Sequence, residues 1–267
     1  MFFSCVRIAP LLCLGLAVAS SEVLAGAWTA PEGHGQVIVT GTASRADRAF
    51  DDDWKIVPTA RTNKFELQGL IEYGVTDRFT AILAPGYQRI DIGAPAEAQR
   101  SGLGYTEFGG RVLLLQGSSW VFSGQTLVRL PGTSERSNPA AIGYTDSEVD
   151  VRALFGASFS LGAWPAFIDM QAAQRFRAGD PPDEFRADMT LGVRPLPQWL
   201  LLAQSFNVFS EGTGAPLFPS YQYHKLQLSV VYDLTPNWSL QLGGFTAYAG
   251  RNALQENGAI FGVWYKF

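Results

Sequence analysis

Residues 257–267 read NGAIFGVWYKF, so the chain ends on an aromatic residue. Every second position from Ala259 to Phe267 is apolar. Alternation with a period of two residues is typical of a β-strand that has one apolar face. Outer-membrane β-barrels commonly end on such a strand, and their assembly machinery binds its terminal aromatic residue. We therefore predict that Val263, Tyr265 and Phe267 form a C-terminal assembly signal.

The same alternation recurs along the rest of the chain. Residues 184–189 are Glu, Phe, Arg, Ala, Asp and Met, so that charged and apolar side chains take turns. Comparable runs occupy 65–72, 148–155 and 225–232. Each run predicts a strand with one apolar and one polar face.

Connections between these runs are alternately short and long. The short turns lie near 76–77, 116–119, 161–164, 195–198 and 235–237, and the long loops near 46–62, 93–101, 132–144, 178–184, 210–220 and 250–257. Gly, Pro, Asp, Asn and Ser are frequent in these segments, as is typical of turns and loops. Together they predict about twelve strands of about ten residues each.

Composition narrows the fold class. The chain has 267 residues, of which 47% are hydrophobic, 13% aromatic and 16% charged, with a net charge of −4. Aromatic residues are too frequent and charges too few for intrinsic disorder, and no basic stretch supports nucleic-acid binding. Beyond the N-terminus the longest apolar run is 199–203, whereas a membrane-spanning helix needs roughly 20 residues.

An all-β transmembrane barrel reconciles dispersed apolar residues with so many strands. In lipid, the apolar face of each strand points outward and the polar face inward, and closure satisfies the backbone. We therefore predict an antiparallel up-and-down barrel of about twelve strands, with short periplasmic turns and longer extracellular loops. Aromatic residues near the strand ends fit an interfacial girdle; they are Trp120, Trp164, Trp199, Tyr232, Trp238 and Tyr265.

The first 25 residues have the pattern of a cleaved signal peptide. Arg7 supplies the positive charge, 8–19 form the apolar centre, and 23–25 (VLA) form a small-residue cleavage site, with 25–27 as the neighbouring option. Both cysteines, Cys5 and Cys13, lie in this segment, so the mature chain has no thiol chemistry. We predict export to the outer membrane of a Gram-negative cell, with 26–267 forming the barrel.

Charged residues on the face opposite the apolar one are candidates for the lumen. The acids are Glu66, Glu72, Glu107, Glu148, Asp150, Asp169 and Asp188; the bases are Arg111, Arg129, Arg152, Arg175, Arg186 and Lys225. A channel selective for one sign of charge carries an excess of the opposite sign, and these two groups nearly balance. The pattern therefore predicts a narrow polar lumen of little ion selectivity, in which many charges can also serve as structural ion pairs.

The segment before the first strand, 26–35, is too short for a plug domain. The short N-terminal segment, or a loop such as 132–144 or 46–62 folded inward, could still narrow the lumen.

Several short motifs resemble a known family. They are residues 28–33 (WTAPEG) with Gly35-Gln36, 72–78 (EYGVTDR), Gly102-Leu103-Gly104 with Glu107 and Arg111, and Leu130-Pro131-Gly132. These stretches resemble outer-membrane proteins of the MetA-pathway phenol-degradation and putative transporter family. In similar proteins an Asp often follows the Gly-Leu-Gly, where Tyr105 stands here. The resemblance implies an outer-membrane barrel that passes small aromatic or hydrophobic compounds.

Catalytic and metal sites are not expected. Some outer-membrane barrels hydrolyse lipids with a serine activated by histidine. Here neither His34 nor His224 is followed by a serine two positions later, and the parity of His224 places it on the lipid face near the extracellular rim. Residues 51–53 are three adjacent aspartates without the spacing of a calcium loop, so we predict a solvated loop tip, no metal and no cofactor.

The sequence thus favours a non-enzymatic channel for passive passage of small molecules. A barrel with a filled lumen, acting in structure or surface interaction, is the second hypothesis, and an outer-membrane lipid hydrolase is the third. The expected partners are outer-membrane lipids and lipopolysaccharide, the assembly machinery at Phe267, and a small solute, with no nucleic acid.

Overall fold

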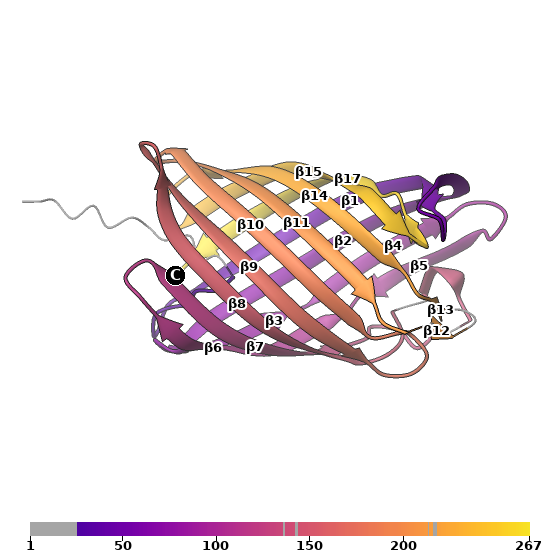
Figure 1. Cartoon of the computed structure of the whole chain (residues 1–267), viewed down its shortest axis with the longest axis horizontal. Helices are drawn as coiled ribbons and strands as arrows, with labels where there is room; N and C mark the ends of the chain where they lie inside the picture. The colour runs from indigo at the N-terminus through magenta and orange to yellow at the C-terminus, as the bar shows by residue number, and fades with distance from the viewer. Residues whose placement is uncertain (1–25, 136, 142–143, 213, 216–217) are drawn as a thin grey trace, which may run out of the picture.

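The chain forms a single closed β-barrel (Figure 1). The computed structural model describes residues 26–135, 137–141, 144–212, 214–215 and 218–267. The predicted signal peptide, 1–25, lies outside these residues. Within them, no helix is long and apolar enough to cross a membrane.

Nearly all described residues belong to strands or to the turns between them. The strands are β1 (Gly35–Phe50), β2 (Ile56–Thr76), β3 (Phe79–Ala84), β4 (Gly86–Ile92), β5 (Ala98–Leu103), β6 (Thr106–Gln116), β7 (Trp120–Leu130), β8 (Glu148–Leu161), β9 (Trp164–Arg177), β10 (Glu184–Leu196), β11 (Trp199–Ser210), β12 (Gly214–Ala215), β13 (Phe218–Pro219), β14 (Gln222–Asp233), β15 (Trp238–Arg251), β16 (Ala253–Leu254) and β17 (Asn257–Lys266). A 3₁₀ turn, η1 (Pro139–Ala141), lies in the loop between β7 and β8.

Barrel closure joins the two ends of the chain. Strand β1 pairs antiparallel with β2 on one side and with β17 on the other, from Gln36↔Lys266 to Arg45↔Asn257. The wall contains twelve antiparallel strands when β3 with β4, and β5 with β6, are each taken as one interrupted strand. The predicted fold class is confirmed.

The two ends of the barrel differ, and we name them by their connections. The turn end carries the short connections, such as 162–163 between β8 and β9, together with the C-terminus (Figure 1). The loop end carries the longer ones, of which 131–147 is the longest. The predicted loop at 46–62 is wrong, because β1 and β2 extend as a hairpin and leave only 51–55 outside the two strands. The predicted loop at 93–101 likewise shortens to 93–97.

One part of the wall is interrupted near the loop end. Pro85 separates β3 from β4, since proline has no N–H to donate to the ladder. Strand β6 pairs with both β3 and β7, whereas β5 pairs only with β4. The free edge of β5 faces loop 131–147, and Asn138 Nδ2 donates to the carbonyl oxygen of Gln99 at 3.1 Å. This loop therefore replaces a strand over the open edge.

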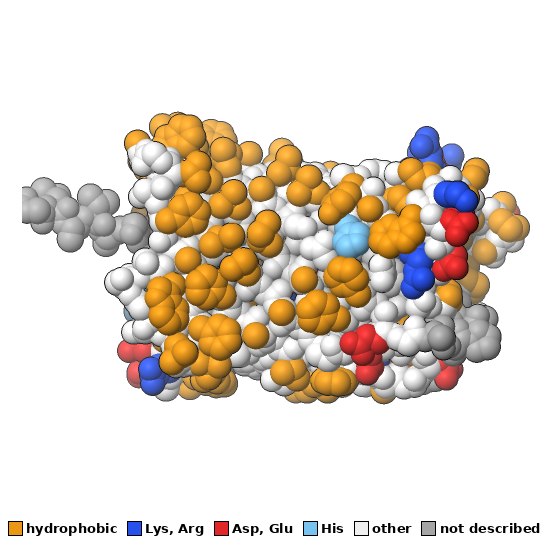
Figure 2. Space-filling view, in the orientation of Figure 1, with side chains coloured by type: hydrophobic (Ala, Val, Ile, Leu, Met, Phe, Trp, Pro, Cys, Tyr) orange, Lys and Arg blue, Asp and Glu red, His pale blue; other side chains and the backbone are white. Residues whose placement is uncertain are grey.

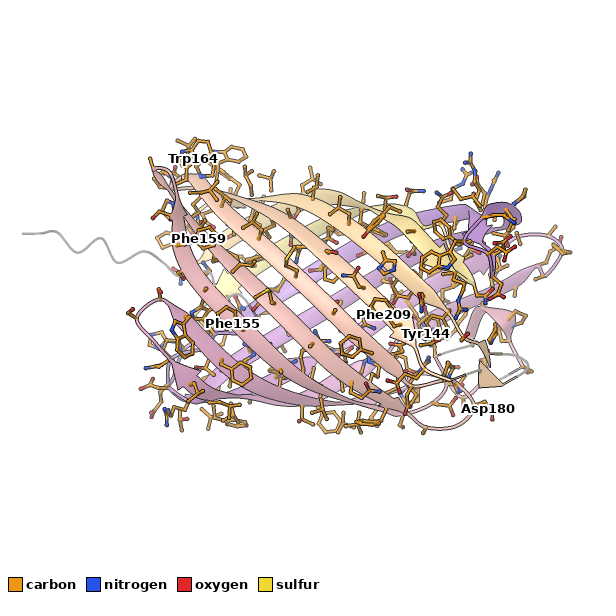
Figure 3. All side chains as sticks on the ribbon, in the orientation of Figure 1. Tyr144, Phe155, Phe159, Trp164, Asp180 and Phe209 are labelled. Carbon is orange, nitrogen blue, oxygen red and sulfur yellow. The ribbon has the colours of Figure 1, made fainter. Side chains whose placement is uncertain are left out.

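The outer surface is apolar, as a lipid-facing wall requires. Orange side chains cover most of the barrel's middle, while charges gather at its two ends (Figure 2). Phe159 and Trp164 point outward near the turn end (Figure 3). Four of the predicted girdle residues pack there as two pairs of tilted rings, Trp199 with Tyr232 at 4.8 Å and Trp238 with Tyr265 at 4.6 Å between ring centroids.

Gly41 marks a tight point in the outer wall beside the β1–β17 junction. The Phe261 ring lies over it, and a methyl group on Gly41 would come within 2.0 Å of Phe261 Cζ. Aromatic side chains often cover strand glycines in this way.

The substitution Gly41→Ala is expected to destabilise the barrel by about 1–3 kcal/mol, because the added methyl displaces the Phe261 ring. The measurement is the temperature at which the folded band on a denaturing gel converts to the unfolded band. Gly124→Ala is the control, since a methyl there would lie 3.5 Å from its nearest neighbour, Leu114 Cδ1. Equal shifts in both variants would contradict the packing argument.

Candidate functional site in the barrel lumen

The thirteen predicted lumen charges are all buried or half-buried, while many of their chain neighbours are exposed on the outer wall. Asp150 and Asp169 are 1% and 2% exposed, whereas Val151 and Met170 are 45% and 42% exposed. The remaining charges follow the same parity; they are Glu66, Glu72, Glu107, Arg111, Arg129, Glu148, Arg152, Arg175, Arg186, Asp188 and Lys225. None of them therefore faces lipid.

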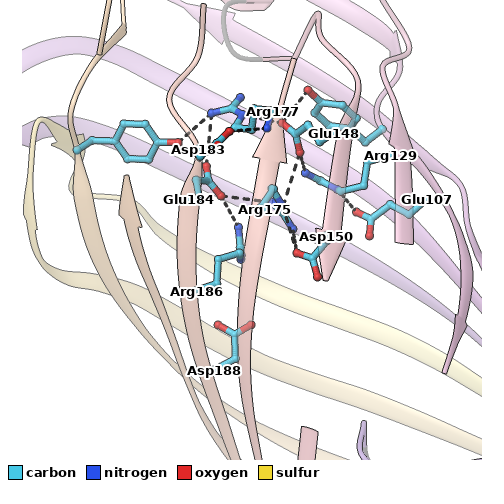
Figure 4. Close-up of polar contacts among 12 residues, drawn as sticks. Glu107, Arg129, Glu148, Asp150, Arg175, Arg177, Asp183, Glu184, Arg186 and Asp188 are labelled. Carbon is cyan, nitrogen blue, oxygen red and sulfur yellow. Dashed lines mark hydrogen bonds and ion pairs between the residues drawn. The ribbon is translucent and has the colours of Figure 1, made fainter. Parts of the chain in front are cut away.

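A ladder of alternating charges crosses the inner wall from β6 to β10 (Figure 4). It starts at Glu107, which accepts a hydrogen bond from Arg129 Nε at 2.8 Å. It continues through Glu148 and the two arginines of β9 to Glu184, and from there to Arg186 at 3.1 Å. A branch joins Arg175 to Asp150 at 3.1 Å, and Asp150 to Arg152 at 3.1 Å.

Like Glu184, Glu148 has three arginines and a tyrosine as partners in this ladder. It accepts hydrogen bonds from Arg129 Nη1, from Arg177 Nε at 2.8 Å and from the Tyr105 hydroxyl at 3.1 Å. Arg175 Nε lies 3.7 Å from the same carboxylate. Since the side chain is 2% exposed, these partners replace the water that a carboxylate would otherwise bind.

Two smaller ionic groups lie elsewhere in the lumen. On the other side of the barrel, Glu256 lies 3.2 Å from Lys64 and also pairs with Lys225. Nearer the turn end, Arg111 Nη2 donates to Glu72 at 2.5 Å. All three groups combine acids with bases, so that the interior carries little net charge.

Sequence reasoning missed four members of these networks: Lys64, Arg177, Glu184 and Glu256. Lys64 and Arg177 lie two residues from Glu66 and Arg175, so the strand period would have found them. Glu184 stands two residues before Arg186 and could have been found in the same way. Glu256 lies in a short connection outside any strand, and only the fold brings it to Lys64.

The lumen is less polar than the sequence predicted. A central cavity of about 560 Å³ is lined by glutamine amides and charge pairs, but also by aromatic and aliphatic side chains. Leu202, Phe167 and Trp264 face it on the turn-end side, and Leu202 and Trp264 are 6% and 8% exposed. The interior is therefore amphipathic. The alternation of polar and apolar residues in the sequence predicted a polar interior and did not show that apolar side chains also line it.

The N-terminal segment, residues 26–31, lies inside the lumen at the turn end. The Ala27 carbonyl accepts a hydrogen bond from Ser123 Oγ at 2.7 Å, and the Trp28 carbonyl accepts one from Arg111 Nη1 at 2.8 Å. The Trp28 ring packs edge-on against Phe167 at 6.2 Å between centroids. The sequence left open whether the N-terminal segment or an infolded loop narrows the lumen. In the structure, the N-terminal segment narrows it at the turn end.

Loop 131–147 narrows the other end. Ala140 and Ala141 are 2% and 0% exposed, and Ala140 packs with Ile90 of β4. Beneath the loop lies a second cavity of about 420 Å³, lined mainly by Ile90, Ile92, Ala140, Tyr144 and the Lys64–Glu256 pair. We call this cavity the vestibule; its walls combine aliphatic side chains with polar ones, among them Thr59, Thr62 and the Lys64–Glu256 pair.

His224 lies on the outer face of the barrel, where its parity placed it. Its Nδ1 is 2.8 Å from Asn207 Oδ1, and its ring stacks on Trp54 at 6.0 Å. The rings of Phe209 and Tyr248 also lie beside it, at 5.4 and 6.1 Å between centroids. Within the described part of the chain no hydroxyl group hydrogen-bonds to its other ring nitrogen.

The three aspartates of 51–53 have partners within the chain. Asp51 Oδ1 accepts hydrogen bonds from the backbone N–H groups of Asp53 and Lys55, and Asp53 pairs with Lys55 at 3.0 Å. Asp52 accepts a hydrogen bond from Asn252. Among the described residues, no group of three or more potential ligands is placed to hold a metal ion.

Comparison with known proteins now identifies the family. Residues 29–267 match the family described as "Putative MetA-pathway of phenol degradation". The chain belongs to this family. The match agrees with the resemblance noted in the sequence and covers almost the whole predicted barrel. No curated protein matches the chain by sequence.

Solved structures with the same fold are outer-membrane barrels. The COG4313 outer membrane channel from Pseudomonas putida F1 is 17% identical, with a TM-score of 0.74 over 92% of this chain and 100% of that one. The NanC porin is 9% identical, with a TM-score of 0.56 over 86% and 100%. The translocator domain of the autotransporter NalP from Neisseria meningitidis is 12% identical, with a TM-score of 0.52 over 87% and 88%. These likenesses show a fold of Gram-negative outer-membrane proteins.

The substitution Glu148→Gln is expected to lower the free energy of unfolding by about 3–5 kcal/mol, since it leaves several buried arginines without their shared counter-charge. The gel-shift temperature of the folded barrel measures this loss. Glu66→Gln is the matched control, because Glu66 is half-exposed and Lys64 keeps Glu256 as a partner. A control shift as large as that of Glu148→Gln would argue against the ladder as the main ionic support.

Proposed function

We propose that this chain is a non-enzymatic outer-membrane channel for passive passage of small amphipathic molecules, including aromatic ones. The central cavity of about 560 Å³ carries the proposal, because amide, charged and aromatic side chains line it together. A molecule with an aromatic ring and a hydroxyl or carboxyl group finds partners for both parts there.

The relatives support the same class of solute. The description of the family names phenol degradation, and one structural neighbour is an outer membrane channel. Balanced charges in the lumen favour neutral or weakly charged solutes over a single sign of ion. In this proposal the turn end faces the periplasm, lipid and lipopolysaccharide surround the apolar wall, and Phe267 is recognised during assembly.

Proteoliposomes test the proposal directly. Liposomes containing the folded barrel should swell in phenol-sized solutes faster than empty liposomes do, and planar bilayers should show small, weakly selective conductance. Absence of both swelling and conductance would favour the second hypothesis, a barrel with a structural or surface-interaction role. Hydrolysis of the liposome phospholipids that disappears in His224→Ala would instead support the lipid hydrolase.

Trp28 is expected to limit the passage at the turn end. The substitution Trp28→Ala removes the ring that packs against Phe167, so the rate of swelling should rise several-fold for solutes larger than phenol. Trp164→Ala is the control, since Trp164 is 49% exposed on the outer wall and its loss leaves the lumen unchanged. Equal rates in the two variants and the unchanged protein would show that the N-terminal segment does not narrow the path.

The vestibule is expected to select apolar solutes. Ala140→Trp places an indole in this cavity of about 420 Å³ and should reduce swelling in aromatic solutes several-fold. Ala153→Trp puts the same side chain on the exposed outer face of β8 and serves as the control. If aromatic solutes enter both variants at the same rate, the vestibule does not lie on their path.

A further inference from the structure

Asp169 is a buried carboxylate with an incomplete set of partners. It points into the lumen near the turn-end start of β9 and is 2% exposed. Its Oδ1 accepts a hydrogen bond from Gln171 Nε2 at 2.6 Å, whereas its Oδ2 is buried and has no hydrogen-bond partner among the described residues. A buried carboxylate in this state is costly unless a cation lies beside it.

The nearest arginines are engaged elsewhere. Arg111 pairs with Glu72 at 2.5 Å, and Arg152 pairs with Asp150 at 3.1 Å and with Asp188 at 2.9 Å. Neither forms an ion pair with Asp169 within the described chain. Asp169 thus differs from the acids of the ladder, each of which pairs with at least one arginine.

Gly26 lies directly against this carboxylate. A methyl group on its Cα would lie 3.2 and 3.3 Å from the two oxygens of Asp169 and 2.2 Å from Gln171 Nε2. A residue with a side chain would therefore collide here, and the backbone of Gly26 approaches where a side chain could not. Gly26 is also the residue that follows the predicted cleavage site of the signal peptide, at Ala25.

We propose that cleavage between Ala25 and Gly26 creates the cation that Asp169 lacks, and that the new α-ammonium holds the N-terminal segment inside the lumen. Water hydrolyses the peptide bond, so Ala25 leaves with a carboxylate and Gly26 keeps the nitrogen, which binds a proton. An N-terminal amine is ordinarily protonated at neutral pH. In the precursor the same nitrogen is a neutral amide that is tied to Ala25.

Processing then completes the constriction. The hydrogen bonds from Ser123 and Arg111 position the segment, and the ion pair to Asp169 anchors its free end. Because the α-ammonium rotates freely about the bond from Cα to the carbonyl carbon, it can turn toward the carboxylate once Ala25 is gone. Asp169 thereby becomes a binding site for an ammonium group that belongs to the chain itself.

Chemical labelling of the α-amine tests this proposal without any transport measurement. Mass spectrometry of the purified barrel should show a chain that begins at Gly26, and its α-amine should react slowly with an amine-directed reagent. Asp169→Asn should speed this labelling by about tenfold, because the ion pair that buries the amine is lost. Asp188→Asn is the control, since Asp188 already pairs with Arg152.

A second variant keeps Asp169 and inserts two glycines between Ala25 and Gly26, which moves the α-ammonium away from the carboxylate. It should label as fast as Asp169→Asn even if that variant folds poorly. A mature chain that begins at Trp28, or equal labelling rates in the unchanged protein and both variants, overturns the proposal.

A conductance measurement gives a further test, and this test rests on the proposed function. If the lumen is a channel, both Asp169→Asn and the variant with two inserted glycines should conduct more than the unchanged protein. Slow labelling that Asp169→Asn accelerates, combined with no conductance in any variant, would support the ion pair between the α-ammonium and Asp169 and contradict the channel. Increased conductance without increased labelling would support the channel and contradict the ion pair between the α-ammonium and Asp169.

Discussion

Backbone N–H and C=O groups surrounded by hydrocarbon must find partners within the protein, because lipid offers none. In this chain the pairing of β1 with β17 meets that demand, since it joins the first strand to the last and removes the edges of the sheet. The paired hairpin of β1 and β2 extends further than the apolar band requires. Where the wall is interrupted, at the free edge of β5, Asn138 of loop 131–147 donates a side-chain hydrogen bond to the carbonyl oxygen of Gln99.

Closure creates an interior in which charges are also short of water. The ladder from Glu107 to Arg186 solves this problem by giving each acid one or more arginines. Such networks are costly to break and contribute little net charge to the lumen. The ladder therefore serves the stability of the wall, while the central cavity, with its amides and aromatic rings, supplies the surface that a solute would contact.

Asp169 departs from this arrangement, because it lies beside the N-terminal segment and not beside an arginine partner. Its carboxylate lacks an arginine and instead faces the backbone of Gly26. The N-terminal segment and the vestibule loop narrow the lumen from opposite ends, so under the proposed function a solute passes two elements that are not strands. In a barrel with a rigid wall, such elements are where selectivity can be adjusted.

Much of the fold could be predicted from local pattern. Alternation in 184–189 and 257–267 determined strands and the direction in which each side chain points, because the strand period is two residues. Residues 46–62 were predicted as a loop because polar residues are frequent there. In the structure, pairing between β1 and β2 keeps most of these residues in strands that extend beyond the apolar band. Alternation also could not tell that Leu202 lines the lumen, because residues 199–203 are apolar on both faces of the strand.

By itself, then, the sequence determined the class of the fold, the number of strands and the parity of the thirteen lumen charges. Only the tertiary structure decided which charges meet, as when Glu256 of a short connection reaches Lys64 across the lumen. It also decided that residues 26–31 enter the barrel and that η1 folds under the loop end. The physical reason is that strand periodicity is a local property of the chain, whereas ion pairs and constrictions depend on closure, which brings distant residues together.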